Sequence, residues 1–117
     1  MGKLTTHVLD TAHGKPGHGI ALTVYRIDGE RRRRVAAATT NADGRTAAPL
    51  VEGETFAAGV YEIEFAAGEY FARIGASVAS PPFIGDVVVR FGVSDAGAHY
   101  HVPLLVSPWS YSTYRGS

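Results

Sequence analysis

The chain has 117 residues, a hydrophobic fraction of 45%, and eleven basic side chains that balance eleven acidic ones. This length and charge predict a single domain over residues 1–117 and exclude a general attraction to nucleic acid or to acidic membranes. The sequence contains no cysteine, which excludes disulfides and thiolate chemistry, and no apolar run typical of a signal peptide or a membrane span, so we expect a cytoplasmic protein.

Alternation of apolar and polar residues predicts three strands in the first half of the chain. They cover Leu4–Asp10, Ile20–Ile27 and Arg32–Thr40. The segment Thr11–Gly19 is rich in glycine and predicts a loop, and Asp28–Gly29 predicts a tight hairpin turn. We interpret the four arginines Arg31–Arg34 as a solvated strand entry rather than an anion-binding patch.

The second half of the chain also alternates, after a turn at Asn41–Thr46. Strands are predicted around Val60–Ala67, at Asp86–Val93, at His99–Val106 and in the segment 109–116. In the first of these, Tyr61, Ile63 and Phe65 would face the core, while Glu62 and Glu64 would face outward.

One segment, Ala67–Ala76, has helical spacing, with an apolar stripe at Tyr70, Phe71 and Ile74. Seven or eight short strands with one short helix are typical of a β-sandwich, so we predict an all-β fold of two sheets. Pro103 cannot donate a ladder hydrogen bond, so we expect an irregularity in its strand.

The histidines are the first candidates for chemistry. His99 and His101 are two residues apart on a predicted strand, so their imidazoles would lie on one face, and His7 lies in the first strand. Three imidazoles are suited to binding zinc, and histidine is equally suited to metal-free acid–base catalysis because its pKa is about 6.5. The residues alone leave both alternatives open.

Two arginines and the terminal serine are weaker candidates. Arg45 closes the Asn41–Thr46 turn, where a solvated role is the plain interpretation. Arg115 has the planar guanidinium needed to bind an anionic or carbonyl-rich ligand. Ser117 has no base beside it in the sequence. From the residues alone we therefore predict a β-sandwich with a candidate histidine–arginine site.

Two segments of the chain resemble the signature segments of the 5-hydroxyisourate hydrolases, the transthyretin-like enzymes of purine catabolism. They are LTTHVLDTAHGKPGHG, residues 4–19, and HYHVPLLVSPWSYSTYRGS, residues 99–117. The final YRGS is the element that separates these enzymes from transthyretin, the hormone carrier of the same fold. Gly17 is a small departure, since many members have alanine there.

The resemblance implies a transthyretin-like sandwich that hydrolyses 5-hydroxyisourate to 2-oxo-4-hydroxy-4-carboxy-5-ureidoimidazoline, in the degradation of urate to allantoin, with no metal or organic cofactor. It also implies a homotetramer, a dimer of dimers, whose active sites lie between the dimers. The residues that match the family's catalytic positions are His7, Arg45, His101 and Ser117. Those that match its substrate-binding segments are His99, Tyr114, Arg115 and Gly116. The main alternative is a non-catalytic transthyretin-type carrier of small molecules.

Overall fold

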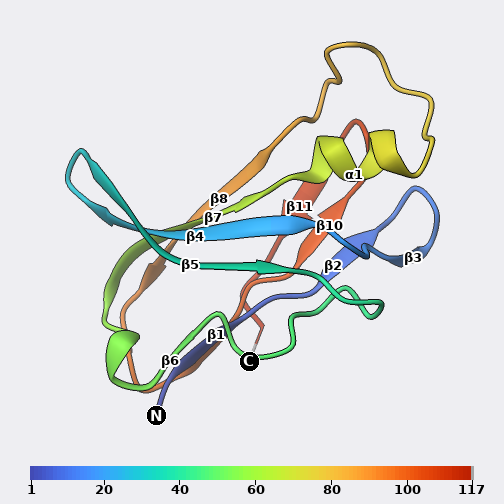
Figure 1. The fold of residues 1–117 in the computed structure, drawn as a ribbon. Coiled ribbons are helices and arrows are strands. Elements are labelled where there is room, and N and C mark those ends of the chain that lie inside the picture. Colours follow the sequence, from blue (N-terminus) through green and yellow to red (C-terminus); the bar gives the residue numbers. More distant parts are fainter. Residues whose placement is uncertain (117) are drawn as a thin grey trace.

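The computed structural model describes residues 1–116, and the predicted site residue Ser117 lies outside the described residues. Within this range the chain forms eleven strands, one α-helix and one 3-10 helix (Figure 1). The elements are β1 (Lys3–Thr5), β2 (Val8–Asp10), β3 (Lys15–Pro16), β4 (Ala21–Asp28), β5 (Arg31–Thr39), β6 (Val51–Glu52), η1 (Gly53–Thr55), β7 (Gly59–Phe65), α1 (Ala67–Arg73), β8 (Val87–Val93), β9 (His99–His101), β10 (Leu104–Val106) and β11 (Tyr111–Thr113).

The strands form two layers, as the alternation predicts. One layer is the antiparallel sheet β5-β4-β7-β8. The other consists of two short sheets end to end, β6-β1-β9 and β11-β10-β2-β3, in which β1 and β2 run parallel to β9 and β10. The predicted all-β sandwich is confirmed.

The strand count is higher than predicted because two expected strands are interrupted at the same level of the second layer. Leu4–Asp10 is divided into β1 and β2, and His99–Val106 into β9 and β10. The Val8 amide donates to the Gly44 carbonyl rather than to a strand neighbour, at 2.8 Å. On the adjacent strand, Pro103 has no amide hydrogen to donate, as expected.

The remaining differences are the two-residue strands β3 and β6. β3 lies inside the segment Thr11–Gly19, which the glycines predict as a loop, and it pairs at the edge of its sheet with β2. Pro16 has no amide hydrogen to donate, and this is tolerated at the edge because no second strand is there to accept a hydrogen bond. β6 pairs with β1 in a segment for which no element is predicted.

Helix α1 is shorter than the predicted Ala67–Ala76. It ends at Arg73 because Gly75 has a left-handed φ of +81° and donates to the Ala72 carbonyl at 3.1 Å, which closes the last turn. Tyr70 and Phe71 are buried as predicted.

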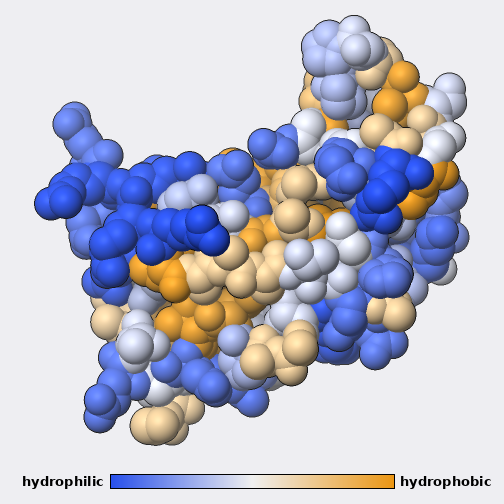
Figure 2. Space-filling model, viewed as in Figure 1, coloured by the Kyte–Doolittle hydropathy of each residue, from blue (hydrophilic) through white to orange (hydrophobic). Residues whose placement is uncertain are grey.

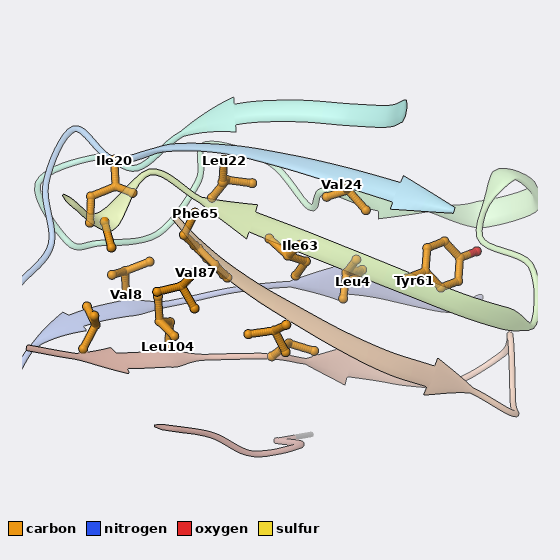
Figure 3. Close-up of a cluster of buried hydrophobic side chains, with 14 of the residues drawn as sticks. Leu4, Val8, Ile20, Leu22, Val24, Tyr61, Ile63, Phe65, Val87 and Leu104 are labelled. Carbon is orange, nitrogen blue, oxygen red and sulfur yellow. The ribbon is translucent and has the colours of Figure 1, made fainter. Parts of the chain in front are cut away.

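The core lies between the two layers (Figure 3). Tyr61, Ile63 and Phe65 point into it from β7 and are at most 1% exposed, as the alternation predicts. Each fully buried side chain of this size contributes roughly 1.5–3 kcal/mol to folding. Glu62 lies on the outer face of the same strand but is also buried, because Arg32 and Arg90 bind its carboxylate at 3.0 and 2.8 Å.

The four arginines Arg31–Arg34 are exposed on β5, the edge strand of its sheet, as expected for a solvated strand. Figure 2 shows this end of the molecule as a strongly hydrophilic surface. Charge along an exposed edge discourages pairing with a second sheet. Among residues 1–116 no helix has the length and apolar character needed to span a membrane.

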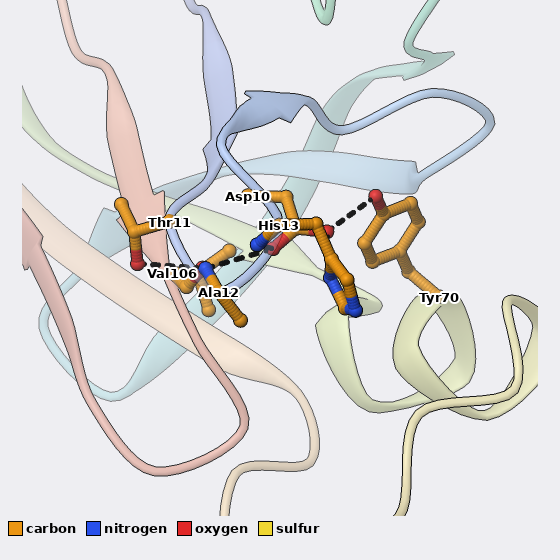
Figure 4. Close-up of polar contacts among 6 residues, drawn as sticks. All are labelled: Asp10, Thr11, Ala12, His13, Tyr70 and Val106. Atoms are coloured by element: carbon orange, nitrogen blue, oxygen red, sulfur yellow. Dashed lines mark hydrogen bonds and ion pairs between the residues drawn. The ribbon is translucent and has the colours of Figure 1, made fainter.

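The buried carboxylate of Asp10 connects the end of β2 to α1 (Figure 4). Asp10 is 1% exposed and accepts hydrogen bonds from the Ala12 and His13 amides at 3.0 Å, from His13 Nδ1 at 2.7 Å and from the Tyr70 hydroxyl at 2.8 Å. Burial and the bond to Asp10 raise the pKa of Tyr70 to about 12. This network joins the turn after β2 to the helix.

Candidate active site

A hollow of about 450 Å³ lies over the outer face of β1 and β9, where the second layer is interrupted. Its lining residues are Thr5, Thr6, Arg45, Thr46, Ala47, Ala48, Pro49, His99 and His101. Six of the nine are threonine, arginine or histidine, so the hollow offers hydrogen-bond donors suited to a carbonyl-rich ligand.

His99 and His101 lie on the same face of β9, as their spacing predicts. The intervening Tyr100 is buried, and both imidazoles bond to the hydroxyl of Thr5 on β1. The distances to Thr5 Oγ1 are 2.7 Å from His99 Nε2 and 2.8 Å from His101 Nδ1. The parallel register of the two strands, which places Thr5 opposite His101, produces this contact.

Arg45 reaches the hollow because the turn that contains it is tightly folded against β2. The Asn41 side-chain oxygen accepts hydrogen bonds from the Asp43 and Arg45 amides, at 2.9 and 3.1 Å. Gly44 has a left-handed φ of +74°, and its carbonyl accepts the Val8 amide. The Arg45 side chain is exposed, and no carboxylate among residues 1–116 pairs with it.

His7 lies at the interruption between β1 and β2, rather than within a strand. Its Nε2 is 2.8 Å from the Asp43 carbonyl. A carbonyl can only accept, so Nε2 must carry the proton, and in the neutral ring Nδ1 holds the free electron pair.

The electrostatics of the hollow favour a neutral His101. Burial lowers the pKa of His101 below its ordinary value of 6.5, and the nearby charges of Arg45, His99 and His7 lower it further. A neutral imidazole beside an uncommitted guanidinium can accept a proton from water near pH 7.

The C-terminal segment is divided between two places. Gly116 pairs with the His101 backbone, with its amide 2.7 Å from the His101 carbonyl. By contrast, the Arg115 guanidinium lies 4.0 Å from the centre of the Tyr100 ring, and Tyr114 and Arg115 line a smaller hollow of about 170 Å³ beside β8.

Of the predicted site residues, Arg45, His99 and His101 line the hollow. His7 bonds to Asp43 in the turn that contains Arg45, and Gly116 pairs with the His101 backbone. The structure does not bring Tyr114 and Arg115 to the same hollow within one chain, and Ser117 lies outside the described residues. In residues 1–116, no three histidine, aspartate or glutamate side chains are grouped as metal ligands.

Sequence reasoning missed Thr5. The only local signal is that Thr5 is two residues before His7 and so shares its face in an alternating strand, which is common to many solvated threonines.

Comparison with known proteins connects this arrangement to one family. The HIUase/Transthyretin family matches residues 4–116. A relative from Ralstonia nicotianae, "5-hydroxyisourate hydrolase", is 59% identical over 117 residues, covering 100% of both chains.

Solved structures of two kinds share the fold. The 5-hydroxyisourate hydrolase of Klebsiella pneumoniae has a TM-score of 0.82 and 32% identity, with 100% of each chain covered. Sea bream transthyretin in complex with thyroxine has a TM-score of 0.86 and 30% identity, covering 97% of this chain and 94% of the other. The fold alone does not separate a hydrolase from a carrier, whereas the much higher identity to the Ralstonia protein favours the hydrolase.

Proposed function

The chain belongs to the HIUase/Transthyretin family, and on this premise we propose that it is an enzyme that hydrolyses 5-hydroxyisourate. The observation that supports this most strongly is 59% identity, over the full length of both chains, to a protein named for that activity. The product is 2-oxo-4-hydroxy-4-carboxy-5-ureidoimidazoline, an intermediate in the degradation of urate to allantoin.

Hydrolysis of the ring amide needs three things from the protein. A base must remove a proton from water, so that its oxygen can form a bond to the carbonyl carbon. The negative charge on the carbonyl oxygen must be stabilised. As the C–N bond breaks, an acid must return a proton to the leaving ring nitrogen.

His7 and His101 supply the base and later the acid in this proposal, through a shared water. The free electron pair of neutral His7 is on Nδ1, because Nε2 bonds to the Asp43 carbonyl. His101 Nδ1 is bonded to Thr5, which leaves Nε2 available to the water. The lowered pKa of His101 keeps it neutral at the start of the reaction.

Arg45 binds the substrate carbonyls and offsets the charge that develops on the attacked oxygen. Its guanidinium lines the same hollow as His101, and no carboxylate among residues 1–116 neutralises it.

Substrate-binding roles for His99, Tyr114, Arg115 and Gly116, and a catalytic role for Ser117, are part of the same proposal. Gly116 supports it by pairing with the His101 backbone. Tyr114 and Arg115 lie beside β8 in one chain, so their contact with substrate requires the arrangement of the C-terminal segment in an assembly.

That assembly is a cytoplasmic homotetramer, a dimer of dimers with an active site at the contact between dimers. Two features support it: the hollow lies on an open face that a second subunit would cover, and β8 and β11 are edge strands with exposed apolar side chains. Val88 on β8 is 42% exposed and Tyr111 on β11 is 47% exposed. Sedimentation of the purified protein tests the stoichiometry.

The experiment that tests the activity is the ultraviolet decay of freshly prepared 5-hydroxyisourate, with and without the protein. We expect His101→Asn to lower turnover about 100- to 10,000-fold. Arg45→Ala should lower it about 100- to 1,000-fold. Arg34→Ala is the matched control, since this arginine is also exposed but lies on β5 away from the hollow.

Unchanged decay in the presence of the wild-type protein would remove the proposed activity. The oligomeric state of each variant must equal that of the wild type, because simultaneous loss of the tetramer and of activity would leave the catalytic assignment unsupported.

The alternative of a transthyretin-type carrier has one observation in its favour, the fold shared with a thyroxine-bound transthyretin. The two histidines and the arginine in the lining disfavour it, because a carrier of an apolar hormone would be lined by aliphatic side chains. Tight binding of an apolar aromatic ligand without any acceleration of substrate decay would support the carrier instead.

A further inference from the structure

One hydroxyl group connects the two histidines of β9. Thr5 Oγ1 lies 2.7 Å from His99 Nε2 and 2.8 Å from His101 Nδ1, and both are hydrogen-bond distances. Thr5 is half-buried on β1, and its own carbonyl accepts the Val102 amide at 2.9 Å, so the residue is anchored by its backbone.

The number of protons restricts what this arrangement can be. Two hydrogen bonds need two hydrogens, and the Thr5 hydroxyl supplies only one. When both imidazoles are neutral, one of the two ring nitrogens that face Thr5 must therefore carry a proton and the other must not. The hydroxyl makes the tautomers of His99 and His101 depend on each other.

The positive charge of Arg45 favours one of the two possible pairs of tautomers. Its guanidinium lines the hollow with His101, so a lone pair on the free His101 nitrogen is favoured over an N–H bond that would point toward a positive charge. That lone pair is on Nε2, which places the His101 proton on Nδ1, directed at Thr5. The Thr5 hydroxyl then donates to His99 Nε2, and the His99 proton is on Nδ1.

From this geometry we propose that Thr5 is a positioning residue: it holds His101 with the proton on Nδ1 and the electron pair of Nε2 directed at the attacking water. The inference rests on the proposed function for its catalytic meaning, but the tautomers can be measured without substrate. Thr5 would act on the reaction through His101, as the residue that orients a catalytic imidazole does in other hydrolases.

The direct test is a nitrogen-15 NMR spectrum of the histidine side chains at a pH above 7.5, without substrate. We expect both His99 and His101 to carry their protons on Nδ1 in the wild type. In Thr5→Val, which keeps the shape and strand propensity of the side chain but removes both hydrogen bonds, this pattern should be lost for both rings. A wild-type His101 with its proton on Nε2 would overturn the proposal.

Kinetics provide the second readout. Thr5→Val should lower kcat about 10- to 100-fold, the range typical of residues that orient a functional imidazole, with KM nearly unchanged. Thr5→Ser keeps a hydroxyl and should restore most of the rate. The control Thr23→Val alters another half-buried strand threonine, on β4, and should behave as the wild type.

A Thr5→Val variant with wild-type kcat would overturn the positioning role, and so would equal losses in Thr5→Val and Thr5→Ser. These outcomes are distinct from failure of the proposed function, in which the wild type itself would not accelerate substrate decay while the NMR spectrum would still report the tautomers.

Discussion

The substitution Gly44→Ala, compared with a control, should distinguish the effect of moving the Arg45 turn away from β2 from the effect of backbone strain alone. Gly44 has a φ of +74°, and a Cβ atom there would lie 2.3 Å from the Val8 carbonyl oxygen. The exposed Gly29 is the matched control, because it has a similar φ of +62° but a Cβ atom added there would have no neighbouring atom within 4 Å. Both substitutions strain the backbone, and only one forces the turn away from β2.

The structure gives the relative magnitudes. A left-handed conformation destabilises alanine by about 1–2 kcal/mol, so both variants should lose that much free energy of unfolding. At Gly44 the contact with a backbone oxygen also forces the turn to move, which removes the 2.8 Å bond from the Val8 amide. Loss of that bond adds about 0.5–1.5 kcal/mol.

Thermal unfolding followed by circular dichroism measures this difference, at equal subunit concentrations because assembly shifts the Tm. At about 4 °C per kcal/mol, Gly29→Ala should lower the Tm by about 4–8 °C, and Gly44→Ala should lower it by about 2–6 °C more than that. Below both transitions, Gly44→Ala should also lose about 100-fold in activity, since a displacement of about 1 Å in a catalytic group has that effect.

Two results would refute the reasoning about this turn. The first is equal Tm values for the two variants, which would mean that the turn accommodates the added methyl group without moving. The second is wild-type activity in Gly44→Ala, which would mean that the contact of the turn with β2 does not position Arg45.

Three further predictions concern the buried carboxylate, the pH dependence and the metal. Asp10→Ala should lower the free energy of unfolding by about 3–5 kcal/mol in urea titrations, because it leaves the buried Tyr70 hydroxyl and two amides without their acceptor. Tyr70→Phe should lower the free energy of unfolding by less than half as much, and equal losses in the two variants would contradict the network. Activity should fall on acidification below pH 6.5, since the lowered pKa of His101 keeps the neutral base available down to that pH, and a midpoint of kcat/KM above 6.5 would contradict the assignment. The same shift means that the neutral His101 stabilises the folded state above pH 6.5, and that this contribution is lost as the pH falls through the folded-state pKa. Exhaustive chelation should leave full activity, whereas stoichiometric zinc in a metal analysis would restore the alternative of a zinc site.

Local spacing in the sequence is enough to specify which face of a strand a side chain occupies. Alternation in β7 places Tyr61, Ile63 and Phe65 in the core, because successive strand residues face opposite sides of a sheet. The same rule places His99 and His101 on one face of β9. The family resemblance of the two terminal segments then identified the activity, which composition and periodicity could not do.

The end of helix α1 shows where local reasoning loses accuracy. The apolar stripe predicts a helix to Ala76, but Gly75 closes it after Arg73 with a left-handed residue. A glycine at this position is a local feature, so the end of the helix could have been predicted from the sequence. The interruption of Leu4–Asp10 is different, because it depends on a hydrogen bond between Val8 and Gly44, which are distant in the sequence.

The groups that meet at the site are brought together by long-range strand pairing. Thr5 and His101 are 96 residues apart, and they meet because β1 pairs in parallel with β9 in one particular register. The position of the Arg115 guanidinium, over the Tyr100 ring and 3.4 Å from the His99 carbonyl, likewise depends on contacts with residues distant in the sequence. Alternation specifies which face of a strand a side chain occupies, but it does not specify which strands are neighbours. The chemistry of this hollow depends on the pairing of the strands.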